Sequence, residues 1–212
     1  MDLEIKQREL AELRERMQAL EDELRGQESK SGPSWPPRGF YGAYYATTGF
    51  MLGAVGAAVS LLANVIAAPV AGKRPLELIQ VFLTFPLGER ALSLDTQTNG
   101  GLIIAMGCCL YLATGMLLGV PLYVVMARIC GHDAPLVKRL VVGGVSGLVL
   151  WAIAFYGILA WLQPLLFEGR WITDPAVLPP WVAAVTHVLF GCTLGAIYSW
   201  GQFTPYQVTP RE

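Results

Sequence analysis

The chemistry that this sequence could perform rests first on its two histidines, of which only one lies in an apolar segment. His187 is enclosed by apolar residues between about 181 and 201. An imidazole at membrane depth is a candidate functional group, able to ligate haem iron or to hydrogen-bond a quinone carbonyl. A bis-histidine haem site needs a second such histidine, which the sequence lacks. His187 is therefore a candidate cofactor contact, and an interhelical hydrogen bond is the competing interpretation.

A second group of reactive residues is the loop sequence Cys130-Gly131-His132-Asp133. Cys130 and His132 are both metal-ligand types, but two ligands do not complete a tetrahedral site. The sequence has no Walker loop and no HExxH, GxSxG or dinucleotide-binding motif. We therefore predict no catalytic residue and no metal site, and no cofactor beyond the haem or quinone considered for His187. The balance of these residues is against an enzyme.

Charge is concentrated at the N-terminus of the 212-residue chain. Residues 1–38 hold nine of its 16 acidic and seven of its 15 basic residues, and the remaining 174 residues share only seven acidic and eight basic ones. The net charge of −1 gives no basic track for nucleic acid. Proton pumps and charge-coupled carriers place ionised residues at membrane depth, and the long apolar segments contain none. This absence counts against an autonomous transporter.

Four apolar segments are long enough to cross a bilayer as helices. They cover residues 44–68, 101–126, 140–165 and 181–201. Their unbroken apolar character excludes β-barrel strands, which alternate and are about ten residues long. The predicted fold is an all-α membrane protein, with a four-helix transmembrane domain over 40–206 and a polar tail at 207–212. Polar residues within the segments can form interhelical hydrogen bonds, namely Ser60, Asn64, Ser146, Gln163 and Thr193.

Each predicted span carries two glycines four residues apart. The pairs are Gly49 and Gly53, Gly115 and Gly119, Gly143 and Gly147, and Gly191 and Gly195. Glycines at this spacing form a flat helix face, which lets two backbones approach closely. They predict packing faces, either between helices of this chain or against other subunits of an oligomer.

The loop after the first span contains a further short helix, predicted at residues 75–86. Glu77, Gln80 and Thr84 share one face of it, and apolar residues cover the rest. About a dozen residues are too few to span, so the helix should lie at the membrane interface. The alternative is the wall of a groove for lipid or quinone.

The N-terminal arm, residues 1–25, has the heptad pattern of a coiled coil. Its apolar residues recur at the a and d positions, which are occupied by Leu3, Leu10, Leu13, Met17, Leu20 and Leu24, with Lys6 the polar exception. Mixed charges flank this seam and suit pairing with a partner of defined orientation, either another subunit or a second copy. Residues 26–39 are rich in Pro, Gly and Ser and form the predicted linker.

The distribution of basic residues predicts the orientation in the membrane. Arg128, Lys138 and Arg139 lie between the second and third spans, and the arm and linker are rich in Lys and Arg. The positive-inside rule places both termini in the cytoplasm, in a plasma membrane of the bacterial inner-membrane type. The pattern favours a non-catalytic accessory or scaffold subunit of a membrane complex, assembled through glycine-rich faces and the coiled coil. A redox subunit that uses His187, or a carrier or channel for an uncharged solute, are the alternatives.

Overall fold

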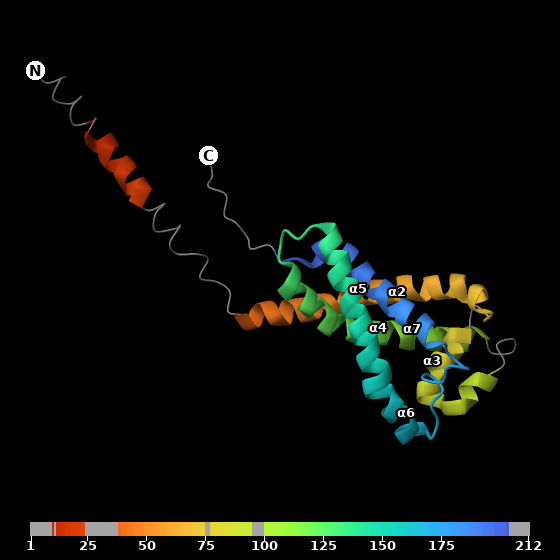
Figure 1. The fold of residues 1–212 in the computed structure, drawn as a ribbon. Coiled ribbons are helices and arrows are strands. Elements are labelled where there is room, and N and C mark those ends of the chain that lie inside the picture. The colour runs from red at the N-terminus through yellow and green to blue at the C-terminus, as the bar shows by residue number, and fades with distance from the viewer. Residues whose placement is uncertain (1–9, 11, 24–37, 75–76, 95–99, 204–212) are drawn as a thin grey trace, which may run out of the picture. The chain divides into compact units, whose positions relative to one another are not determined.

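The computed structural model describes residues 10, 12–23, 38–74, 77–94 and 100–203. The chain divides into two units, residues 1–40 and 41–212. In the first unit, residues 12–23 are helical (Figure 1). In the second, every regular element among the described residues is a helix, so the all-α prediction is confirmed.

The helices follow one another along the chain, and the segment 168–179 connects α6 to α7. They are α2 (Arg38–Ala67), η1 (Ala68–Ala71), α3 (Glu77–Leu87), η2 (Gly88–Ser93), α4 (Gly100–Cys130), α5 (Leu136–Ala152), η3 (Ile153–Leu159), α6 (Ala160–Phe167), α7 (Pro180–Ala196) and η4 (Tyr198–Gly201). The short helix predicted at 75–86 corresponds to α3, whose described residues are 77–87.

Within the part of the chain that the structure describes, three segments are long and apolar enough to cross a membrane, which supports a multi-pass membrane protein. They are Tyr41–Val70, Gly100–Cys130 and Leu136–Phe167, with 30, 31 and 32 residues. The fourth apolar helix, α7, has 17 residues and reaches roughly 26 Å, just short of a 30 Å hydrocarbon core.

Two of the predicted spans differ from the helices in the structure. The third is not a uniform helix, because α5 passes through the π-helical turn η3 before it continues as α6. The π-helical turn ends just before Ala160. The Ala160 carbonyl receives no helical hydrogen bond from residue 164, because Pro164 has no N–H. The fourth ends as an α-helix at Ala196 and continues only as the 3-10 turn η4.

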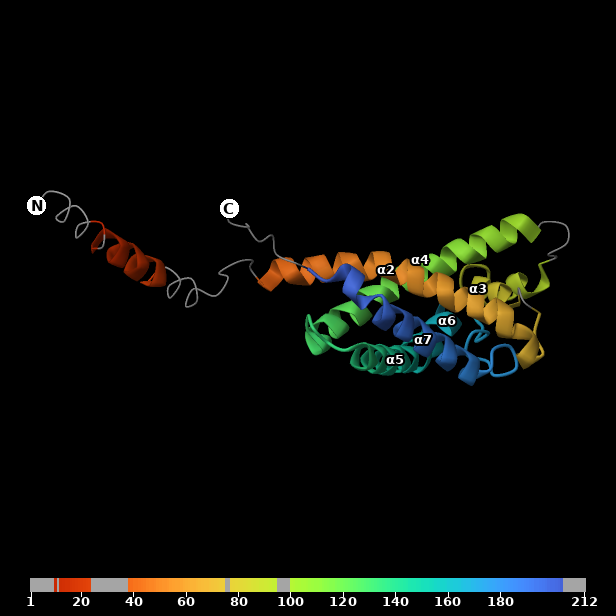
Figure 2. The same ribbon diagram turned by 90° about the horizontal axis from the view of Figure 1, so that it is seen from above.

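The helices of the second unit form two antiparallel pairs. Figures 1 and 2 show α4 running back across α2, and α7 running back alongside α5. The start of α2, the loop 131–135 and the end of α7 lie together at one end of this unit. The helix α3, the end of α6 and the start of α7 lie at the other, which we call the α3 end (Figure 2).

Glycines bring α2 and α4 into backbone contact. A Cβ added at Gly53 would lie 2.5 Å from the Gly115 carbonyl oxygen, and one at Gly49 would lie 2.6 Å from the Gly119 oxygen. Real Cβ atoms do not approach an oxygen this closely, so only glycine permits this helix separation.

The α5 and α7 pair is built in the same way. A Cβ at Gly143 would collide with the Gly191 carbonyl, and one at Gly147 with the backbone carbonyl of His187. Near the end of α7, a Cβ at Gly195 would lie 2.6 Å from the Arg139 carbonyl oxygen. The glycine faces of both pairs therefore pack against helices of this same chain.

A buried cluster joins the two pairs at the end opposite α3. Tyr123 and Tyr198 are almost completely buried, together with Met126 and Leu194. The Tyr123 hydroxyl donates to the Tyr198 carbonyl at 2.7 Å, and the Tyr198 hydroxyl donates to the Gly131 carbonyl at 3.2 Å. These bonds hold the end of the α7 segment against α4 at the point where the helix continues as a 3-10 turn.

Candidate functional site

Two of the three residues of the polar stripe predicted on α3 lie inside the protein rather than at a water-facing surface. Gln80 and Thr84 are buried, with 5% and 0% of their surface exposed. Gln80 donates from Nε2 to the Leu94 carbonyl at 3.0 Å, which ties α3 to the end of the η2 segment. Because buried polar groups need partners, these two residues serve protein contacts and are not free to bind a ligand.

Gln163 on α6 is the residue that completes this arrangement. It is 0% exposed, and its Nε2 donates to Thr84 Oγ1 at 3.1 Å. Its Oε1 accepts the Ile172 backbone N–H at 3.0 Å. One amide thus connects α3, α6 and the loop that leads to α7. This three-way junction closes the α3 end of the bundle.

Glu77, the third member of the stripe, begins α3 and is surrounded by two cations. It accepts from Lys73 Nζ at 3.0 Å and from the Arg74 backbone N–H at 3.1 Å, as the Glu of a capping box does. Burial alone raises the pKa of Glu77, but these hydrogen bonds and the two positive charges outweigh it. The pKa of Glu77 therefore lies below its ordinary value.

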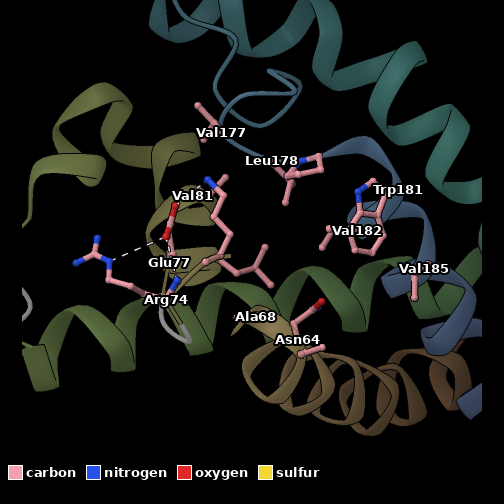
Figure 3. Close-up of a pocket in the computed structure, with 14 residues that line it drawn as sticks. Asn64, Ala68, Arg74, Glu77, Val81, Val177, Leu178, Trp181, Val182 and Val185 are labelled. Atoms are coloured by element: carbon pink, nitrogen blue, oxygen red, sulfur yellow. Dashed lines mark hydrogen bonds and ion pairs between the residues drawn. The ribbon is translucent and has the colours of Figure 1, made fainter. Parts of the chain in front are cut away.

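Beside this charged group lies a small cavity between α2, α3 and the start of α7 (Figure 3). Apolar side chains such as Val81, Leu178 and Val185 line most of it, and Asn64 adds a polar group. Its volume is ≈ 90 Å³, whereas pockets for small ligands and cofactors span about 300–1,000 Å³. The cavity admits water or a few methylene groups but not a quinone ring or a haem.

His187 lies in α7 with its ring against the ring of Phe155, at a centroid distance of 6.4 Å and nearly perpendicular. Its Nδ1 is 2.8 Å from the Ala183 carbonyl oxygen, one turn earlier in the same helix. One ring nitrogen is therefore used within its own helix, and the residue's backbone carbonyl packs on Gly147. These contacts give His187 a role in packing α7 against α5.

The Cys130-Gly131-His132 sequence is likewise part of the helix ends. The Cys130 side chain is buried, and the Gly131 and His132 carbonyls accept hydrogen bonds from Gln202 Nε2. All four cysteines are free thiols. Among the described residues, no three His, Cys, Asp or Glu side chains gather in a way that could hold a metal ion.

Three of the polar residues expected to link helices do so. The Ser60 and Tyr111 hydroxyls are 3.0 Å apart, joining α2 to α4, and the prediction is also confirmed for Gln163. Thr186 Oγ1 lies 2.9 Å from Asn64 Oδ1, joining α7 to α2. Thr193 instead donates its hydroxyl to the Leu189 carbonyl in its own helix.

The glycines proposed as packing faces, Gly49, Gly53, Gly115, Gly119, Gly143, Gly147, Gly191 and Gly195, are all buried within the bundle. Sequence reasoning missed the tyrosines and the Ile172 backbone group that complete the polar contacts. Tyr111 and Tyr123 lie in apolar runs, where a tyrosine has the pattern of any large apolar residue. Only their buried hydroxyls, which need partners, hinted at their role.

The heptad stripe of the arm presents a different surface. Leu3 and Leu24 lie outside the described residues, whereas Leu10, Leu13, Met17 and Leu20 are between 54% and 62% exposed. Charged residues occupy most of the other positions of this helix, including the exposed i,i+4 pair Glu12 and Arg16 at 3.5 Å. The helix therefore carries an apolar stripe that nothing in its own unit covers among the described residues.

No protein-family model, no curated protein and no solved structure matches the chain.

Proposed function

We propose that the protein is a non-catalytic accessory or scaffold subunit of a membrane complex, and that its N-terminal arm recruits or orients the partner. In this proposal it resides in a plasma membrane of the inner-membrane type. The arm and both termini lie in the cytoplasm, on the side favoured by the basic residues near the span ends. The arm is the docking element, and the bundle is its membrane anchor.

The exposed heptad stripe is the observation that carries this proposal. Burying one leucine side chain contributes about 1.5–3 kcal/mol, and an isolated helix of this length is marginal in water. A charged helix that leaves Leu10, Leu13, Met17 and Leu20 in contact with water therefore gains stability and helicity from a partner helix. The absence of aromatic residues from the arm and its acidic character disfavour an anionic lipid surface as the alternative.

The membrane body supports a structural role. Its glycine faces pack its own helices, its polar stripe closes the α3 end, and the cavity beside Glu77 is too small for a cofactor. We further propose four crossings, since α7 and η4 together reach roughly 34 Å. In this arrangement α3 is an interfacial helix between the first two crossings.

Native-gel electrophoresis of the full chain and of a variant lacking residues 1–25, both extracted from membranes in mild detergent, tests the proposal. The full chain should migrate as a complex, and the shortened chain as a smaller species with an intact body. A matched variant keeps the arm but replaces Leu13 and Leu20 with Ser, and should behave like the deletion. Identical monomer bands for all three proteins, with nothing co-purifying, would overturn the proposal.

A further inference from the structure

The charges beside the arm's apolar seam are placed so that, in a pair of identical helices, positive residues of one copy face negative residues of the other. With Leu10 and Met17 at the a position and Leu13 and Leu20 at d, Arg16 occupies a g position and Glu21 an e position. We propose that the partner of the arm is a second copy of this chain, aligned parallel and in register. This inference rests on the proposed function, because it uses the same arm as the docking element.

In a parallel pair, each g residue faces the e residue five positions later on the other helix. Arg16 of one copy then faces Glu21 of the other, and the twofold symmetry repeats this attractive pair. Glu9, which lies outside the described residues, has the same relation in the sequence to Arg14. Among the described residues of the single chain, the ion pair of Arg16 is an exposed contact with Glu12, which is weak enough for Arg16 to exchange partners.

The antiparallel pair is disfavoured by the same residues. When the two stripes overlap fully in opposite directions, g residues face g residues and e residues face e residues. Arg16 then lies near its own symmetry mate, as does Arg14, and Glu9 lies near Glu23. Like charges at these positions repel, so the sequence selects against this orientation.

Chain connectivity favours the parallel pair as well. The membrane body follows the C-terminal end of each arm, so two parallel arms direct both linkers toward the same membrane. In an antiparallel pair, one linker must run back along the length of the coil, which for residues 1–25 is roughly 37 Å. The part of the linker before α2 begins at Arg38, residues 26–37, reaches at most about 40–43 Å, so it would be almost fully extended over that distance.

Cysteine cross-linking of the full chain in native membranes tests the register. Met17→Cys places a thiol at an a position, where two copies meet at the same residue in a parallel pair. We expect a disulfide-linked dimer on mild oxidation, well above the background of the wild-type cysteines, and little from Ala19→Cys on the outward face. A dimer formed only when Met17→Cys and Leu13→Cys chains are mixed would indicate the antiparallel arrangement and overturn the proposal.

Charge reversal gives a second test that does not depend on cysteine. Arg16→Glu alone and Glu21→Arg alone each turn both Arg16–Glu21 contacts repulsive, and should weaken self-association on the order of tenfold. The double variant again places opposite charges at both contacts, and so does a mixed pair formed by co-expressing the two single variants. Both should therefore recover self-association. If the double variant remains as weak as the singles, the pairing is wrong.

The two proposals fail differently. If the full chain still migrates as an arm-dependent complex but neither cross-links to itself nor responds to charge reversal, the scaffold proposal stands and its partner is another protein. If the complex persists without residues 1–25, the scaffold proposal itself fails.

Discussion

Leu20 in the arm and Val145 in α5 have the same exposed fraction, 58%, and yet the two exposures have different physical meanings. Leu20 lies on a helix dense in charge, where the surrounding medium is water and exposed apolar surface is costly. Val145 lies in a 32-residue apolar segment, where lipid tails cover it at no cost. An exposed apolar side chain is therefore evidence for a missing partner only where the solvent is known.

The same contrast governs how each region is stabilised. Without a hydrophobic drive between its helices, the body depends on close backbone packing and on satisfied hydrogen bonds. The described residues of the arm make no such close packing, and in our proposal the arm is stabilised by burying its stripe against a partner. Substitutions that remove each kind of interaction should therefore affect the body and the arm differently. The following four predictions are ordered from the largest expected effect to the smallest.

Gly53→Leu should unfold the bundle, because even a Cβ at this position meets the Gly115 carbonyl. We expect a loss of more than about 3 kcal/mol in stability and a chain that no longer elutes as a single species in detergent. Gly42→Leu is the matched control in the same helix, since a Cβ there has no neighbour within 4 Å. Equal elution profiles for the two variants would contradict the packing argument.

Gln163→Leu should open the α3 end without disrupting the glycine-packed pairs. The substitution leaves Thr84 and the Ile172 N–H without their partner, at a cost of about 2–4 kcal/mol. We expect a lower unfolding temperature by tryptophan fluorescence and faster proteolysis within residues 168–179. Thr47→Val, which removes an exposed bond within one helix, is the control and should change neither.

The contrast between an apolar side chain exposed to water and one exposed to lipid can be tested directly with Leu20→Ser and Val145→Ser. Leu20→Ser should weaken arm-dependent association by about 1.5–3 kcal/mol per copy and leave the unfolding temperature of the body unchanged. Val145→Ser should leave association unchanged. A native gel of both variants, run beside the wild type, measures the difference. Equal loss of the complex in both would show that the body's outer surface also binds the partner.

The smallest effect concerns pH. Because the pKa of Glu77 is lowered in the folded protein, its stabilising contribution is present above its ordinary value of 4.5 and is lost as the pH falls through the folded value. The unfolding temperature of the wild type should therefore fall below about pH 5 more steeply than that of Glu77→Gln. The extra loss in the free energy of unfolding of the wild type, relative to Glu77→Gln, should be about 0.5 kcal/mol. Parallel pH profiles would argue against a folded-state role for this carboxylate.

The helices of the body were predictable because lipid imposes a length and a composition on any segment that crosses it. The predicted segments contain the cores of the helices found, and α3 was predicted nearly to its ends. The junction at Gln163 was not predictable, since its partner Thr84 is 79 residues away and nothing local marks the pair. The bond between Tyr123 and the Tyr198 carbonyl was hidden for the same reason, because the two residues are 75 positions apart.

The unequal lengths of the helices have a consequence for the lipids around the protein. The 31 residues of α4 extend roughly 46 Å, whereas α7 extends roughly 26 Å, so the hydrophobic height of the bundle varies along its circumference. A mismatch between helix length and bilayer thickness costs fractions of a kcal/mol for each ångström. It is reduced when the bilayer thins beside a short helix or when a long helix tilts. We expect the membrane to be thinner beside α7 than beside α4, so that neighbouring proteins with short spans meet the least elastic resistance on that side.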